Sequence, residues 1–144
     1  MQPAEWKDGW YVVPWQVIFR DIDSFGHVNN AVYLTYFEWA RTSMWLALTG
    51  GSRTADVGFI VDRAECDFLQ QISLEPIEIR VRIGEMRNTS FETLYEIRRE
   101  DGQQLAATGS VVVVLYDLKR QKKMQITDEF RQKVRMFQEA VEQR

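Results

Sequence analysis

The sequence predicts an α+β fold in which an antiparallel five-stranded sheet wraps around one long central helix, with an extra C-terminal helix. Three observations support this prediction. Apolar side chains recur at helical spacing through residues 32–48, whereas segments between residues 57 and 118 alternate or cluster as they do in strands. A narrow apolar stripe then follows residue 127, as in a helix lying on a core. We expect residues 1–144 to form one domain.

The composition is that of an ordinary globular protein. Hydrophobic residues make up 45% of the 144 residues and charged ones 27%. A chain of this length and composition can form a core without disulfides or structural metals. The net charge of −3 does not favour binding to nucleic acid. One cysteine, Cys66, and one histidine, His27, exclude an internal disulfide and a multi-cysteine zinc site. We therefore expect no metal, and we expect Cys66 to be a small buried side chain, because no cation flanks it to stabilise a thiolate.

Neither a secretory signal nor a membrane helix is predicted. Residues 1–8 lack a basic stretch followed by an apolar one, and no apolar run approaches the roughly 20 residues that a spanning helix needs. We therefore expect a cytoplasmic protein with no membrane partner.

The predicted strands have different patterns. Pro14 in the first strand is typical of the edge of a sheet, and charges interrupt the second strand. The third and fourth strands alternate cleanly, and the pair Asp101-Gly102 predicts a hairpin turn after the fourth. In the fifth strand, residues 111–116 are apolar on both faces, as in a strand covered on two sides. The five strands are residues 10–19, 57–68, 75–85, 90–100 and 103–117.

The central helix, residues 32–48, has an unusually aromatic and broad apolar face, which predicts that a sheet covers it. Asn29 or Asn30 is a suitable N-cap, because its side-chain oxygen can accept a backbone N–H that has no partner inside the helix. Gly50-Gly51 ends this helix. Thr127 caps the last helix, whose apolar stripe is Phe130, Val134, Phe137 and Val141.

The loop between the first strand and the central helix is the most informative segment. Residues 20–33 contain two carboxylates, Asp21 and Asp23, together with His27 and two asparagines. A carboxylate on a loop that opens a helix lies beside backbone N–H groups without intrahelical partners, and the helix dipole makes that end electropositive. Such a place can stabilise negative charge on a substrate oxygen while the carboxylate attacks or activates water. The loop therefore indicates an enzyme.

The loop resembles the Asp-x-x-Gly-His-Val-Asn-Asn-x-x-Tyr pattern of the 4-hydroxybenzoyl-CoA thioesterase-like acyl thioesterases, which have the hotdog fold. Plant acyl-carrier-protein thioesterases carry a similar His-Val-Asn-Asn run, and the order of elements fits over residues 10–120. The residues that match are Asp23, Gly26, His27, Val28, Asn29, Asn30 and Tyr33, continued by residues 36–41.

The resemblance implies the hydrolysis of an acyl-CoA or acyl-carrier thioester, with no cofactor besides the CoA of the substrate. It implies that Asp23 acts as nucleophile or as base on water, and that the Asn30 N–H polarises the thioester carbonyl. His27 completes the expected catalytic set, and Asn29 and Tyr33 are expected substrate contacts. The CoA arm is expected to cross a subunit interface of a homodimer or homotetramer. Its expected contacts are Arg87, Ser90, Lys119 and Arg120.

One carboxylate and one oxyanion donor can suffice for thioester hydrolysis, because the thioester carbonyl is more electrophilic than that of an amide and a thiolate leaves readily. The chain contains no Gly-x-Ser-x-Gly sequence that would indicate a serine nucleophile. Two rival functions remain open: a hydratase or dehydratase of the same fold, with His27 and Asp23 acting together, and a non-catalytic acyl-CoA-binding module. Open strand edges around a single helix also favour oligomerisation through edge pairing.

Each of these residues also has a structural interpretation. Asp23 can be a turn or cap residue, and His27 either fixes the loop or orients substrate or water. Asp21 is expected to be structural, facing Arg20 or solvent. Glu38 is expected to pair with Arg41 at the surface rather than act as a second catalytic acid. Further side chains are first expected in the core or on solvated faces: Tyr33, Tyr36, Arg80, Arg82, Arg87, Lys119, Arg120, Lys122 and Lys123. Pocket depth is expected to depend on phenylalanines such as Phe59, Phe68 and Phe91.

Overall fold

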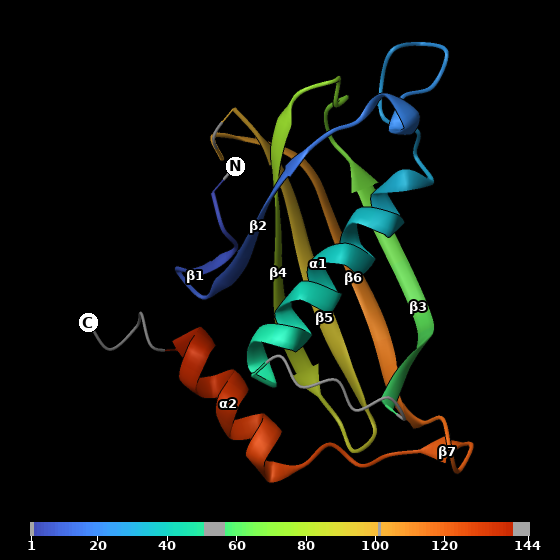
Figure 1. The fold of residues 1–144 in the computed structure, drawn as a ribbon, viewed down its shortest axis with the longest axis vertical. Coiled ribbons are helices and arrows are strands. Elements are labelled where there is room, and N and C mark those ends of the chain that lie inside the picture. The colour runs from blue at the N-terminus through green and yellow to red at the C-terminus, as the bar shows by residue number, and fades with distance from the viewer. Residues whose placement is uncertain (1, 51–56, 101, 140–144) are drawn as a thin grey trace.

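The computed structural model describes residues 2–50, 57–100 and 102–139, and in this part of the chain one antiparallel sheet wraps around a long helix (Figure 1). The strand order is β1-β2-β4-β5-β6-β3, and β7 pairs with β6. The long helix α1 lies across one face of the sheet, and α2 packs near its lower end (Figure 1). The elements are β1 Glu5–Lys7, β2 Trp10–Gln16, a 3₁₀ turn at Phe19–Asp21, α1 Val32–Leu48, β3 Val57–Phe68, β4 Pro76–Met86, β5 Ser90–Arg99, β6 Gln104–Asp117, β7 Lys122–Lys123 and α2 Asp128–Glu139.

The predicted α+β arrangement is confirmed, with two changes at its edges. The five predicted strands form the body of the sheet, and α1 has the predicted bounds. The short strands β1 and β7 were not predicted, because three and two residues are too few to show a pattern. β2 ends at Gln16 instead of Phe19, since the chain turns into the 3₁₀ segment. Pro14 has the predicted edge character, because β1 pairs with β2 only as far as Val12.

The inner face of the sheet carries the predicted alternation. On β4 and β5, every second side chain from Ile77 to Ile83 and from Phe91 to Ile97 is buried. β6 differs from the prediction, because Val111 and Val113 are buried whereas Val112 and Val114 are only half-buried. The physical reason is that α1 covers one face of β6, and no helix in the described part of the chain covers the other.

α1 is held against the sheet by a close approach at Gly109 of β6. The ring of Phe37 stacks on Tyr95 of β5, with 4.2 Å between centroids. A Cβ atom at position 109 would lie 2.4 Å from the Phe37 ring, which is closer than carbon atoms can approach. A glycine at this position therefore lets the aromatic side chains of α1 reach the strands.

Two side chains lie elsewhere than predicted. Arg41 does not pair with Glu38 at the surface: it is 7% exposed, and its Nη1 donates to the Tyr95 hydroxyl at 3.0 Å. The prediction failed because Arg41 lies on a flank of α1 that faces the sheet. Cys66 is half-buried, not fully buried, because its strand β3 lies at the edge of the sheet.

The C-terminal helix α2 begins as predicted and then makes an unpredicted contact. The Thr127 hydroxyl accepts the Phe130 N–H at 3.1 Å, as a cap should. Near the other end, the buried Gln138 amide accepts the Ile83 N–H at 2.7 Å and donates to the Ile83 carbonyl at 2.9 Å. α2 is thus bonded to the main chain of β4. Three residues used in the predictions, Gly51, Asp101 and Val141, lie outside the described residues.

Neither helix in the part of the chain that the structure describes combines the length and the apolar character required to cross a membrane.

Candidate functional site

The loop between β2 and α1 closes on itself before the helix begins. Ile22 and Val28 form an isolated antiparallel bridge, and the Asp23 N–H donates to the His27 carbonyl at 2.9 Å. Val28 is buried, and its N–H donates to the Ile72 carbonyl at 2.8 Å, which anchors the loop to the segment before β4. Gly26 turns the tip of the loop with a φ of +84°, a conformation that favours glycine.

The Asp23 carboxylate uses one oxygen for the loop. Its Oδ1 accepts the Phe25 N–H at 2.9 Å and, at 3.4 Å, the His27 N–H. None of the hydrogen bonds between described residues involves Oδ2. Asp23 is half-buried and lines a cavity of about 320 Å³. The structural role as a turn residue and a chemical role are therefore compatible, because different oxygens serve them.

The start of α1 leaves one amide without a partner. The Asn29 side chain accepts the Ala31 N–H at 2.9 Å, so it satisfies an amide as predicted, but the N-cap residue is Ala31 and not Asn29 or Asn30. No hydrogen bond within the described ranges has the Asn30 N–H as its donor. Asn30 lines the same cavity as Asp23. A substrate oxygen in this cavity could accept that N–H at the positive end of the helix dipole.

Two tyrosines of α1 border the loop, and both are buried as predicted. Tyr33 lines the cavity, with its ring 4.8 Å from that of Phe68. Burial, with a smaller effect of the nearby Cys66, raises the pKa of Tyr33, so its phenol stays protonated at neutral pH. A protonated phenol can donate a hydrogen bond to a substrate.

Tyr36 fixes the loop to the helix. Its hydroxyl donates to Asp21 Oδ2 at 2.8 Å, and burial followed by this contact raises the pKa of Tyr36. Asp21 is therefore structural as predicted, but its partner is Tyr36 and not Arg20 or solvent. Because Asp21 also accepts the Asn29 N–H through its carbonyl, the contact positions both sides of the loop.

His27 is half-buried and lines the cavity with Asp23. Its backbone bonds to Asp23, and no hydrogen bond of its imidazole is present among the described residues. Cys66, on the neighbouring strand β3, has a pKa raised to about 11, first by burial and then by Asp67. Its thiol is protonated at neutral pH, which fits the prediction that it is not a nucleophile.

Part of the cavity wall comes from a segment that the sequence did not connect with the loop. Phe68 ends β3, and the N–H groups of Leu69 and Gln70 both donate to the Ala106 carbonyl, which fixes the segment beside β6. Phe68 was a candidate for setting pocket depth, but no sequence signal pointed to the two glutamines. The wall residues that the loop itself does not supply are Tyr33, Phe68, Leu69, Gln70 and Gln71.

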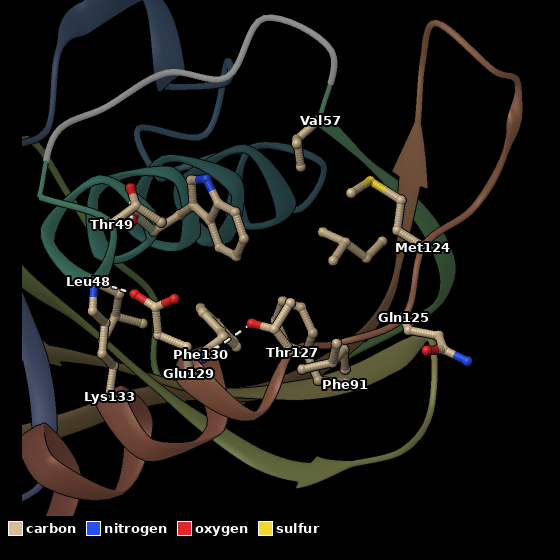
Figure 2. A pocket seen from close by; sticks show the side chains of 13 residues that line it. Leu48, Thr49, Val57, Phe91, Met124, Gln125, Thr127, Glu129, Phe130 and Lys133 are labelled. Atoms are coloured by element: carbon tan, nitrogen blue, oxygen red, sulfur yellow. Dashed lines mark hydrogen bonds and ion pairs between the residues drawn. The ribbon is translucent and has the colours of Figure 1, made fainter.

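A second cavity, of about 260 Å³, lies at the opposite end of α1 (Figure 2). Trp45, Phe91 and Phe130 form an aromatic wall, with the Trp45 and Phe130 ring centroids 5.0 Å apart. Glu129 and Lys133 of α2 lie at its polar side (Figure 2). Tyr33, which lines the first cavity, and Trp45, which lines the second, are separated by about 18 Å of helix.

The residues predicted to contact CoA lie near this second cavity and not near Asp23. The turn that carries Arg87 and Ser90 joins β4 to β5 at the lower end of the sheet, and the Asn88 carbonyl there accepts the Ile126 N–H (Figure 1). Lys119 and Arg120 follow β6 at the same end, where their N–H groups donate to Asp117 Oδ1. Within one chain the structure therefore brings together Asp23, His27, Asn30 and Tyr33, with Asn29 beside them, but not the four CoA candidates.

The basic side chains at that end are exposed, and their partners are mainly carboxylates. Arg87 pairs with Glu85 at 3.3 Å, and Arg120 lies 3.9 Å from Asp117. Arg80 and Arg82, within β4, are half-buried instead of fully solvated as expected: Arg80 pairs with Glu78 at 2.7 Å, and Arg82 lies over the Trp10 ring. Within residues 2–50, 57–100 and 102–139, no group of three or more His, Cys, Asp or Glu side chains is arranged to hold a metal ion.

Comparison with known proteins agrees with this architecture. Residues 17–134 match the model of the Thioesterase-like superfamily, and the chain belongs to this family. A relative of Bacillus subtilis (strain 168), the uncharacterized protein YsmA, is 30% identical over 127 residues, which are 87% of this chain and 86% of the relative.

Solved structures confirm the hotdog fold. A predicted thioesterase from Bacillus stearothermophilus has a TM-score of 0.80 at 22% identity, covering 89% of this chain and 96% of its own. A thioesterase superfamily protein from Jannaschia sp. CCS1 has a TM-score of 0.81 at 24% identity, with 94% and 86% covered. Slr0204 of Synechocystis, a 1,4-dihydroxy-2-naphthoyl-CoA thioesterase, has a TM-score of 0.74 at 21% identity, with 87% and 95% covered. At these identities the likeness establishes the fold alone.

Proposed function

We propose that this protein hydrolyses acyl-CoA thioesters to a free acid and CoA, with Asp23 as general base or nucleophile. One observation carries the proposal: the Asp23 carboxylate and the Asn30 N–H, which has no partner in the described structure, line the same cavity where α1 begins. A base and an oxyanion donor are the two groups that thioester hydrolysis requires. Membership of the Thioesterase-like superfamily supports this chemistry.

In the general-base form, a water oxygen attacks the thioester carbonyl carbon while its proton passes to an Asp23 oxygen. The carbonyl oxygen gains the electron pair and accepts the Asn30 N–H, with the dipole of α1 favouring its charge. Collapse of this oxyanion breaks the carbon–sulfur bond and releases CoA as a thiolate. In the nucleophilic form an Asp23 oxygen attacks instead, and water then hydrolyses the resulting mixed anhydride.

The other cavity residues have supporting roles in this proposal. Tyr33, whose raised pKa keeps its phenol protonated, can donate to the acyl group or to the attacking water. His27 orients substrate or water from the same wall, and Asn29 holds the start of the helix through its bond to Ala31. Phe68 and Leu69 give the cavity an apolar side for the acyl group.

The proposed enzyme is a homodimer or a homotetramer whose sites lie between subunits. Among the described strands, the twelve-residue β3 pairs only with β6, so a long edge is open in the single chain. Antiparallel pairing of two β3 edges about a twofold axis also reverses the two α1 helices. The lower end of a second copy then lies alongside the Asp23 end of the first, with its Arg87, Ser90, Lys119 and Arg120 available to the CoA phosphates.

A thiol-release assay over a panel of acyl-CoAs tests this function. The panel should contain short, medium, long and aromatic acyl groups, with matched acyl-carrier-protein thioesters. We expect free thiol from at least one substrate, and its loss in the Asp23→Asn variant. Hydration of an enoyl-CoA without thiol release would indicate the hydratase, and tight binding without turnover would indicate a binding module. Either outcome would overturn the proposal.

A further inference from the structure

Arg41 is a buried cation whose one side-chain partner among the described residues is neutral. Its side chain lies under α1, with 7% of the residue exposed, and Nη1 donates to the Tyr95 hydroxyl at 3.0 Å. Tyr95 is bonded to the Thr93 hydroxyl at 2.6 Å, which in turn donates to the Val111 carbonyl at 2.9 Å. This chain of hydrogen bonds ends at the sheet without reaching a carboxylate.

A guanidinium group remains charged inside a protein and carries five N–H donors. Buried charges are normally paired, because the loss of hydration costs several kcal/mol that a neutral partner offsets only in part. No carboxylate in the described ranges lies within ion-pair distance of Arg41. An anion from outside the single chain would complete its environment.

The same flank of α1 carries an unpaired carboxylate. Leu34, Glu38, Arg41 and Trp45 are spaced so that they share one flank of the helix. Glu38 is exposed and has no ion pair among the described residues, and Leu34 is 45% exposed. This flank therefore holds an exposed anion and a nearly buried cation, which form no ion pair with each other in the described structure.

This flank lies beside the uncovered part of β3. Trp45 packs against Phe59 and Tyr33 against Phe68, with ring centroids 4.8 Å apart in both pairs. Register with β6 puts Val61 and Phe68 on the face of the sheet that α1 occupies, yet these side chains are 50% and 47% exposed. An open strand edge, an uncovered apolar face and complementary charges all fit a second copy of this chain as the occupant.

A twofold axis through the middle of β3 would bring the two charges together. Residue 39 lies halfway between Tyr33 and Trp45 on α1, and the middle of β3 lies halfway between their two phenylalanine partners. An axis through this point reverses α1, so Glu38 of one helix comes within about one turn of Arg41 of the other. We propose that Glu38 of each copy forms an ion pair with Arg41 of the second copy, closing the interface between the two α1 helices. This inference rests on the dimer in the proposed function.

The test compares the dissociation of dimers in two matched variants. Glu38→Gln removes the proposed charge with little change of shape, and Glu129→Gln removes an exposed carboxylate of α2 whose ion pair in the described structure is with Lys133. We expect Glu38→Gln to weaken the dimer by about 10²-fold or more, measured by sedimentation equilibrium and subunit exchange, because it leaves Arg41 unpaired in a buried interface. Glu129→Gln should have no effect on the dimer.

Reversal of the charges provides a stricter test. Glu38→Arg alone should weaken the dimer more than Glu38→Gln, and adding Arg41→Glu should restore part of the loss. If Arg41→Glu does not fold, the Glu38 variants still decide the question, since Glu38 is exposed in the single chain. A monomeric wild-type protein, or Glu38 variants that associate like the wild type, would overturn the inference. Thiol release is measured on the same samples, so a lack of hydrolysis counts against the proposed function only.

Discussion

At one end of α1 a cavity is lined by Asp23, His27 and Asn30, and at the other end by the rings of Trp45, Phe91 and Phe130. The first cavity contains a carboxylate oxygen and an amide that have no partners in the described structure. In the second cavity, the aromatic side chains pack against one another. Neither Asp23 nor Asn30 is fully buried, and free polar groups near a helix N-terminus are available to a polar ligand.

The difference follows from the helix itself. The N-terminus of α1 has free N–H groups and a positive dipole end, so it favours an anion or an oxyanion. At the C-terminus, the Trp45 carbonyl accepts both the Thr49 N–H at 3.0 Å and the Thr49 hydroxyl at 2.8 Å, so this end of the helix makes its contacts within the chain. We therefore expect substitutions at the first end to change turnover and substitutions at the second to change stability.

The largest expected effect is that of Asp23→Asn. The amide oxygen can still accept the Phe25 N–H, so the loop should keep its shape, but the side chain can no longer act as a base or a strong nucleophile. We expect the turnover number to fall by at least about 10²-fold, with an unchanged circular-dichroism spectrum. Wild-type turnover in this variant would mean that Asp23 is only a turn residue.

A similar loss is expected when the Asn30 N–H is removed. Asn30→Pro deletes this donor, and losing one oxyanion donor typically costs about 10²–10³-fold in turnover. Asn30→Ala is the matched control, because it keeps the N–H and removes only an exposed side chain. Turnover in the alanine variant should stay within about threefold of the wild type, while melting temperatures show whether both variants fold. Equal turnover in the two variants would exclude the backbone donor.

An intermediate effect is expected for Tyr36→Phe. The variant removes the donor to Asp21 and leaves that carboxylate to water, at a cost of about 1.5 kcal/mol of unfolding free energy. The loop that carries Asp23 would then be held less firmly, and we expect turnover to fall roughly tenfold, since small misplacements of a reacting group are costly. Chemical denaturation and thiol release on one preparation would separate the two effects. A loss of stability with full turnover would show that Tyr36 supports the fold alone.

The features that the sequence revealed are those that depend on neighbouring residues. The bounds of α1 and the buried faces of β4 and β5 follow from local periodicity, which the fold retains. Asp23, His27, Asn30 and Tyr33 lie within eleven consecutive residues, so a single loop and one helical turn suffice to bring them to one cavity. Their individual roles remain predictions.

The features that the sequence did not reveal depend on contacts between distant segments. Leu69 and Gln70 line the cavity from a distant segment, which is held by the bonds of both N–H groups to the Ala106 carbonyl. Helical spacing predicted that Arg41 pairs with Glu38 at the surface. It could not show that the Arg41 guanidinium donates to the hydroxyl of Tyr95, which lies 54 residues later in the sequence. The sequence likewise could not show that the predicted CoA contacts lie far from Asp23, because their separation depends on how α1 packs along the sheet.

The smallest effect on turnover is expected for Phe130→Ala at the aromatic end. The half-buried ring packs on Trp45 and Phe91, so its loss should cost about 2 kcal/mol and lower the melting temperature by about 5–8 °C. Turnover of the shortest acyl-CoA substrate should stay within about threefold, because the ring lies a helix length away from Asp23 of its own chain. Thermal unfolding and thiol release measure the two quantities. A hundredfold loss of turnover at unchanged stability would place chemistry at the aromatic end and reverse the assignment of the two cavities.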